Sequence, residues 1–111
     1  TNGKISGAAR QAELQQKIAA MQEKMAEIQN DVEAQEFTAS VGGGVVEARV
    51  NGKKEVLAVH IKPEAVDPED VEMLQDLVVS AVNEALRQAG EAMDKSMESA
   101  AGGLDLSGFG L

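Results

Sequence analysis

The sequence contains no cysteine, no tryptophan and no tyrosine, and it has only two phenylalanines among its 111 residues. Without cysteine, disulfide bonds, zinc–thiolate sites and thiol catalysis are excluded. Aliphatic side chains must therefore fill the core of the single domain that this length indicates. No apolar run reaches the roughly 18 residues of a membrane-spanning helix, and the first residues show no hydrophobic signal core. These absences predict a soluble, cytoplasmic protein.

Charge is abundant but unevenly distributed. The formal net charge is −9, yet residues 1–30 hold four basic and three acidic side chains. Residues 63–100, in contrast, hold ten acidic side chains and only two basic ones, Arg87 and Lys95. A polyanion would avoid this second half, because like charges repel.

Residues 8–35 contain no glycine or proline and are rich in strong helix formers. Apolar residues recur along this segment at spacings of 4, 3, 4, 3 and 4. This is the heptad pattern of a helix that packs along another helix in coiled-coil fashion. The residues that form this apolar stripe are Leu14, Ile18, Met21, Met25, Ile28 and Val32.

Three strands are expected next, at residues 36–40, 45–50 and 53–61. Asn51-Gly52 is typical of a two-residue type I′ turn, which would place Val50 opposite Lys53 and Val46 opposite Leu57. Alternation then assigns one face of the hairpin to the core. The residues on that face are Val46, Ala48, Val50, Leu57, Val59 and Ile61.

A second long helix is expected at residues 69–100, with Asp67 as its N-cap and Pro68 at its first position. Residues 1–7 are expected to be a disordered or tag-like N-terminus, and the glycine- and leucine-rich residues 101–111 a flexible tail. Helices of roughly 28 and 32 residues would be about 40–48 Å long, whereas a six-residue strand covers only about 20 Å. The helices must overhang the sheet, and this predicts a homodimer with projecting helical arms.

The glycine run at residues 42–44 is not a phosphate-binding loop, because no Gly-Lys-Ser/Thr follows it and it leads into a strand. A bend or bulge of the backbone is the expected role. His60 is the only histidine and has no nucleophile or metal partner evident in the sequence. We therefore expect no catalytic residue, no metal, no cofactor and no small-molecule substrate, and we do not expect an enzyme.

One group of basic residues remains. Arg10, Lys17 and Lys24 are seven residues apart and form a basic stripe along the first helix. On the other side of the apolar stripe lie Gln15, Gln22 and Gln29, which carry no charge and so cannot form interhelical ion pairs with the basic residues. The basic stripe is either free to contact phosphates or an ordinary solvated face with local ion pairs. A second basic group, which holds Arg49, Lys53 and Lys54, lies near the expected hairpin tip.

Several short motifs occur in a characteristic order and spacing. They are Met21-Gln22-Glu23-Lys24-Met25, Phe37-Thr38-Ala39-Ser40, Gly42-Gly43-Gly44, Val50-Asn51-Gly52, Ile61-Lys62-Pro63 and Leu74-Gln75-Asp76-Leu77-Val78. Through them the chain resembles the YbaB/EbfC family of bacterial nucleoid-associated proteins over about residues 10–100, and a YbaB/EbfC-like domain is expected at residues 8–100.

The resemblance implies an α+β fold, α-β-β-β-α, with a small antiparallel sheet and two long helices in a tweezer-like homodimer. It also implies duplex DNA binding by the helical arms, in the cytoplasm and at the nucleoid, for nucleoid organisation or gene regulation. The implied DNA-binding residues are Arg10, Lys17, Lys24, Arg87 and Lys95.

The residues predicted to pack in the dimer or the core are Leu14, Ile18, Met21, Met25, Ile28, Val46, Val50, Leu57 and Val59. An alternative function is a protein-interaction adaptor that uses its apolar arms and tail. The net charge of −9 favours that alternative.

Overall fold

The computed structural model describes residues 7–103 and contains two long helices and a three-stranded antiparallel sheet. The elements are α1 (Gly7–Glu33), β1 (Glu36–Val41), β2 (Val46–Asn51), β3 (Val56–Ile61), the short 3-10 helix η1 (Pro63–Ala65) and α2 (Val71–Gly103). The predicted α-β-β-β-α order is confirmed. The predictions for residues 1–6 and 104–111 lie outside the described residues.

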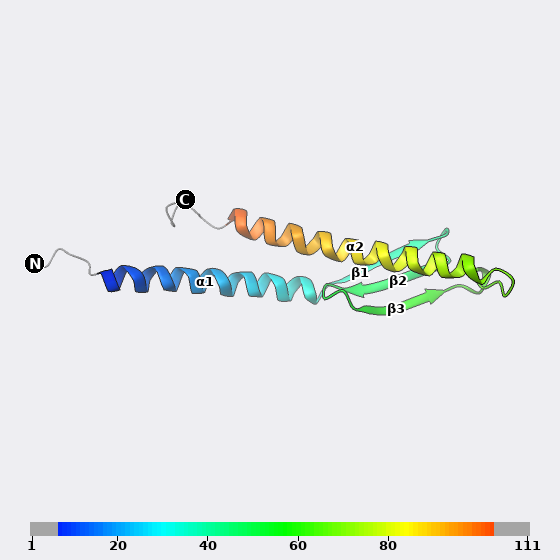
Figure 1. Ribbon diagram of the computed structural model, residues 1–111, viewed down its shortest axis with the longest axis horizontal. Coiled ribbons are helices and arrows are strands. Elements are labelled where there is room, and N and C mark those ends of the chain that lie inside the picture. The colour runs from blue at the N-terminus through cyan, green and yellow to red at the C-terminus, as the bar shows by residue number, and fades with distance from the viewer. Residues whose placement is uncertain (1–6, 104–111) are drawn as a thin grey trace, which may run out of the picture.

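The molecule is a long rod (Figure 1), with principal extents of 87 × 20 × 16 Å. Its radius of gyration is 22.9 Å, whereas a compact domain of 100 residues would have about 13 Å. We call the sheet with the overlying first part of α2 the head, and α1 with the last part of α2 the arm. In the part of the chain that the structure describes, neither helix is long and apolar enough to cross a membrane.

The core lies where α2 crosses the sheet. The strand order is β1-β2-β3, and α2 packs on β1 and β2. Alanines at spacings of four share one face of a helix, and their small side chains let the α2 backbone approach the central strand. Six residues at this contact have no exposed surface: Val46, Ala48 and Val50 of β2, and Ala81, Ala85 and Ala89 of α2.

The predicted two-residue turn between β2 and β3 is wrong, because β3 begins only at Val56. The N–H of Lys54 donates to the carbonyl of Asn51 (3.0 Å), and Lys54 itself has a positive φ of 66°. The Asn51 side-chain oxygen accepts from the N–H groups of Lys53 (2.9 Å) and Glu55 (3.0 Å). The loop is therefore a turn closed by one left-handed residue, a common longer hairpin connection.

The longer loop changes the pairing of the strands. Val46 lies opposite Ile61, not Leu57, and Ala48 lies opposite Val59. At Val50, beyond an irregularity of the pairing, the partner is Val56, three residues from the predicted Lys53. From Val46 to Arg49 the predicted register is shifted by four residues, and an even shift keeps each side chain on its predicted face. Leu57, Val59 and Ile61 thus share the face of Val46, but they are exposed because α2 does not extend over β3.

The three glycines at residues 42–44 form the turn between β1 and β2. All three have positive φ, at 62°, 74° and 95°, a region that favours glycine. The N–H of Gly44 donates to the carbonyl of Val41 at 3.1 Å. The run therefore shapes the backbone at the end of the head that lies away from the arm.

The start of α2 also differs from the prediction. Asp67 is not its N-cap, because Asp67 accepts the N–H of Glu69 within a preceding turn (2.9 Å). Asp70 caps the helix instead, since its carboxylate accepts the N–H of Met73 at 3.2 Å. At its other end α2 continues to Gly103, three residues beyond the predicted end.

Candidate nucleic-acid interface

The basic stripe lies along one edge of α1. Arg10, Lys17 and Lys24 are all exposed, and the fourteen residue steps from the first to the last cover about 21 Å of helix. Within residues 7–103, none of the three takes part in an ion pair, since the pairs found there involve Arg49 and Arg87. The stripe therefore presents three cations to solvent.

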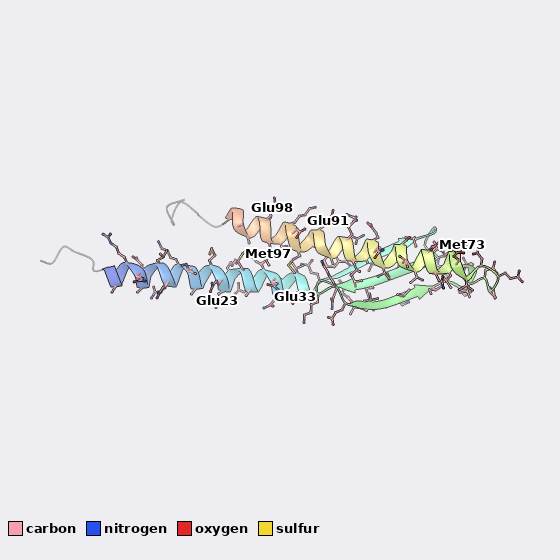
Figure 2. The ribbon with its side chains drawn as sticks, viewed as in Figure 1. Glu23, Glu33, Met73, Glu91, Met97 and Glu98 are labelled. Atoms are coloured by element: carbon pink, nitrogen blue, oxygen red, sulfur yellow. The ribbon has the colours of Figure 1, made fainter. Side chains whose placement is uncertain are left out.

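The apolar stripe of α1 lies beside these cations and is covered only in part. Val32 is buried, and Met21, Met25 and Ile28 are half-buried where α1 runs beside α2. Figure 2 shows Met97 of α2 between the two helices of the arm. Leu14 and Ile18, nearer the start of α1, remain 45% and 37% exposed.

Arg87 is held by two carboxylates of its own helix. Its guanidinium lies 2.5 Å from Glu84 and 2.7 Å from Glu91, in i,i+3 and i,i+4 pairs. The hydrogen bond from Arg87 lowers the pKa of Glu84, and the same bond raises the pKa of Arg87 above its usual value. Glu91 points away from α1 in Figure 2. The structure therefore does not bring Arg87 together with the basic stripe.

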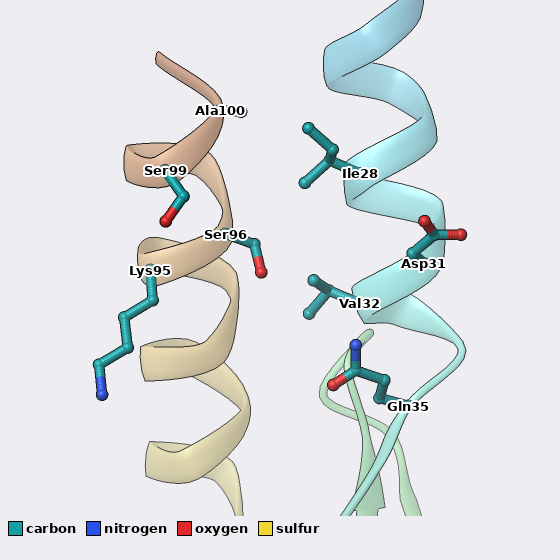
Figure 3. A pocket seen from close by; sticks show the side chains of 8 residues that line it. All are labelled: Ile28, Asp31, Val32, Gln35, Lys95, Ser96, Ser99 and Ala100. Atoms are coloured by element: carbon teal, nitrogen blue, oxygen red, sulfur yellow. The ribbon is translucent and has the colours of Figure 1, made fainter. Parts of the chain in front are cut away.

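Lys95 is placed differently, in the arm. It lines a hollow of about 520 Å³ between α1 and α2, to which Ile28, Asp31 and Val32 contribute from the other helix. Figure 3 shows the Lys95 side chain directed away from α1, at the outer edge of this hollow. Lys95 is thus a cation of the arm, but not part of the basic stripe.

The second basic group lies at the base of the arm, where the β2–β3 loop meets the end of α1. Lys53 and Lys54 line a hollow there together with Glu33 and Asp94. Arg49 lies 3.5 Å from Glu36 across the sheet. Sequence reasoning placed these residues at a hairpin tip but did not place that tip beside α1, because the contact joins distant segments.

One cluster of six acidic residues lies at the opposite end of the molecule from the free part of α1. These residues are found in the head, between the end of β3 and the second turn of α2: Glu64, Asp67, Glu69, Asp70, Glu72 and Asp76. Charges more than about 8 Å apart are largely screened at physiological salt. In a molecule 87 Å long, these six acids therefore have little effect on the electrostatic potential at the basic stripe.

The described residues show no arrangement of side chains typical of a metal site, and their one histidine lies apart. His60 is exposed on the edge strand β3. Between residues 7 and 103, no group of three or more His, Cys, Asp or Glu side chains is arranged to hold a metal ion. The site is a row of cations on a helix, which suits binding to a polyanion.

A model of the YbaB/EbfC DNA-binding family matches residues 8–104. A nucleoid-associated protein of Clostridium acetobutylicum is 53% identical over 88 residues, which are 79% of each chain. Another nucleoid-associated protein, from Alkaliphilus metalliredigens, is 46% identical over 105 residues, covering 95% of this chain and 92% of the relative.

The fold also matches an uncharacterized protein of Helicobacter pylori, with a TM-score of 0.59 and 23% identity over 70% of this chain and 90% of that one. The fold is thus that of an α+β protein, and the family match places it in a DNA-binding class. The chain belongs to the YbaB/EbfC DNA-binding family, which is not an enzyme family.

Proposed function

We propose that this protein is a homodimer that holds duplex DNA by its phosphates through the basic stripe of α1, and that it acts at the bacterial nucleoid. The observation that carries the proposal is the row of three exposed cations on a helix that projects from the head, none of them in an ion pair with another residue of the described range 7–103. The relatives named as nucleoid-associated proteins support the cellular setting, in the cytoplasm and on the chromosome.

The exposed apolar face of β3 supports a dimer. Leu57, Val59 and Ile61 are 43%, 37% and 41% exposed, although they continue the face of the buried core. β3 is also an edge strand, with unpaired backbone groups that a second strand would satisfy. A second copy of the chain would cover this face and this edge together.

Replacement of Val59 by Glu tests the dimer, because a charge buried at an interface is strongly unfavourable. The wild type should have a mass of 23.2 kDa by light scattering, twice the chain mass of 11.6 kDa, and Val59→Glu should shift it toward 11.6 kDa. The control is His60→Glu, which places the same charge on the other face of β3. A wild-type protein that stays monomeric at high concentration would contradict the proposal.

DNA contact by the basic stripe would be directed at the backbone of the duplex. With no tyrosine or tryptophan in the chain, aromatic stacking on bases can come at most from its two phenylalanines. Phosphate contacts position a protein without reading the sequence, so binding should be weakly selective. Three cations per chain give six per dimer, and the plot of log K against log salt should then have a slope of about −5.

The decisive experiment is a series of binding measurements across salt concentrations. Changing Arg10, Lys17 and Lys24 together to Gln should weaken binding and remove most of the slope. A matched control changes Arg49, Lys62 and Arg87 to Gln, which gives the same change in net charge within the head. Equal losses from both triple variants would show that net charge alone matters and that the basic stripe is not the contact.

A further inference from the structure

Four of the five methionines lie in the arm, in two pairs with the same spacing. Met21 and Met25 of α1 are four residues apart, and so are Met93 and Met97 of α2. Residues four apart share one face of a helix, so each helix carries two thioethers on one side. All four side chains are half-buried, whereas the fifth methionine, Met73 in the head, is 44% exposed.

The thioethers lie at the contact between the two helices of the arm. Met97 lies between α1 and α2 in Figure 2, and Met93 lines a hollow together with Gln29 and Glu33 of α1. The apolar side chains of α1 that are not exposed are Met21, Met25, Ile28 and Val32. Because two of these four are methionines, the packing of α1 against α2 depends strongly on thioethers.

The core of the head, in contrast, contains no methionine. Its buried side chains are valines and alanines, and the partly buried side chains packed against them are phenylalanine, valine and leucine. The contacts that fold the head and the contacts that hold the arm together thus differ in chemistry. A reagent that acts on thioethers would change the arm and leave the core of the head intact.

Peroxides are such reagents. Methionine is the only sulfur-containing residue, because the chain has no cysteine. When hydrogen peroxide oxidises a methionine, an S–O bond forms, the O–O bond of the peroxide breaks, and the reduced peroxide leaves as water. The product, a sulfoxide, is polar and disrupts interfaces that are rich in methionine. The partial exposure of the arm methionines gives the peroxide access to their sulfur atoms.

We propose that Met21, Met25, Met93 and Met97 form a site of reversible oxidation by peroxides, and that their sulfoxides loosen α1 from α2 while the head stays folded. A sulfoxide oxygen is unfavourable between packed helices unless it finds a hydrogen bond, so the helices must part to let water reach it. The modification would act on the helix that carries the basic stripe. The proposal goes beyond DNA binding and does not depend on it.

Hydrogen-exchange mass spectrometry of the full chain, before and after treatment with hydrogen peroxide, tests the proposal. Peptide mapping should find one added oxygen atom on each of the four arm methionines. The amides of residues 21–32 and 93–100 should then lose their protection, while those of residues 46–51 and 78–89 in the head should keep theirs. Methionine sulfoxide reductases for both epimers should restore the protection of the arm.

A matched variant changes all four arm methionines to leucine, which has a similar volume and is usually well tolerated in place of methionine. Met73 remains in this variant and reports the dose of peroxide. After treatment, Met73 should be oxidised in both proteins, but the arm of the variant should keep its protection. The amides of residues 46–51 and 78–89 show in the same experiment that the variant is folded.

Three results would overturn the proposal. The first is oxidation of Met73 with the arm methionines left unmodified. The second is an oxidised arm that exchanges as it did before treatment, which includes an arm with no protection to lose. The third is an equal loss of protection in the leucine variant. None of these measurements uses DNA, so failure here is distinguishable from failure of the proposed function.

Discussion

Gly52 lies directly against the last turn of α1, where a Cβ atom on Gly52 would be only 1.9 Å from the carbonyl oxygen of Val32. The Gly52 N–H donates to the carbonyl of Gln35 at 3.1 Å, just beyond the end of this helix. The β2–β3 loop is thus fixed to the base of the arm through its main chain. Glycine is required here because the two backbones are so close.

Replacement of Gly52 by Ala should therefore destabilise the protein strongly. The methyl group would overlap the backbone of Val32 and Glu33, and overpacking of this kind costs about 1–3 kcal/mol. Urea denaturation at a fixed protein concentration measures the free energy of unfolding. The control is Gly102→Ala, which meets nothing within 4 Å. A midpoint for Gly52→Ala equal to that of the wild type would contradict the close contact.

Lys54 has a left-handed backbone that its side chain disfavours. Among the described residues it is the only non-glycine residue with a positive φ, 66°. The left-handed conformation costs roughly 1–2 kcal/mol for an ordinary L-residue. Lys54→Gly should therefore raise the free energy of unfolding by about 1 kcal/mol, and the β-branched Lys54→Val should lower it by a similar amount. Thermal unfolding of both variants tests this, and the opposite order of stability would exclude the turn described.

The contact between α2 and β2 leaves no space for a larger side chain. Ala85 has no exposed surface between the helix and the buried face of β2, so Ala85→Leu should cost about 1–3 kcal/mol through overpacking. The same substitution at the exposed Ala101 should be nearly neutral. Chemical denaturation of both variants gives the comparison, and equal stabilities would show that α2 does not lie on the sheet as described.

The ion pairs of Arg87 predict a pH effect. The folded-state pKa of Glu84 is below its ordinary value of 4.5, chiefly through the hydrogen bond from Arg87. A lowered folded pKa gives a contribution to stability that is present above about pH 4.5 and is lost as the pH falls through the folded value. In Arg87→Gln, the pKa of Glu84 should rise toward 4.5. Carboxyl chemical shifts followed by NMR measure both values, and an unchanged titration would contradict the pair.

The sequence predicts the elements of this fold well because their signals are local. The spacing of Leu14, Ile18 and Met21 predicts α1, and the alternation through Val46, Ala48 and Val50 predicts a strand with one buried face. The predicted register of β2 and β3 was wrong because an Asn-Gly pair is found in two settings. One is a tight type I′ turn, and the other is a place where two backbones approach each other closely. Only the position of α1 beside the loop distinguishes them, and that contact joins distant segments.

The candidate site was predictable in part. The seven-residue spacing of Arg10, Lys17 and Lys24 places them on one edge of a helix, whatever the helix packs against. Arg87 was included among the DNA contacts, although Glu84 and Glu91 at i−3 and i+4 indicate local pairing. The uncovered half of the apolar stripe was not predictable, because it depends on how far along α1 the end of α2 falls.

One feature of the fold limits how such a protein can change in size. α2 is a single continuous helix that supplies both the alanine face of the head and one rod of the arm, and its last buried alanine is Ala89. Deletions that begin at the amino end can trim α1 as far as its exposed residues extend and leave the core whole. The part of α2 beyond Ala89 lies in the arm as well, so the reach of the rod is adjustable through either helix, while the segment between them is tied to folding.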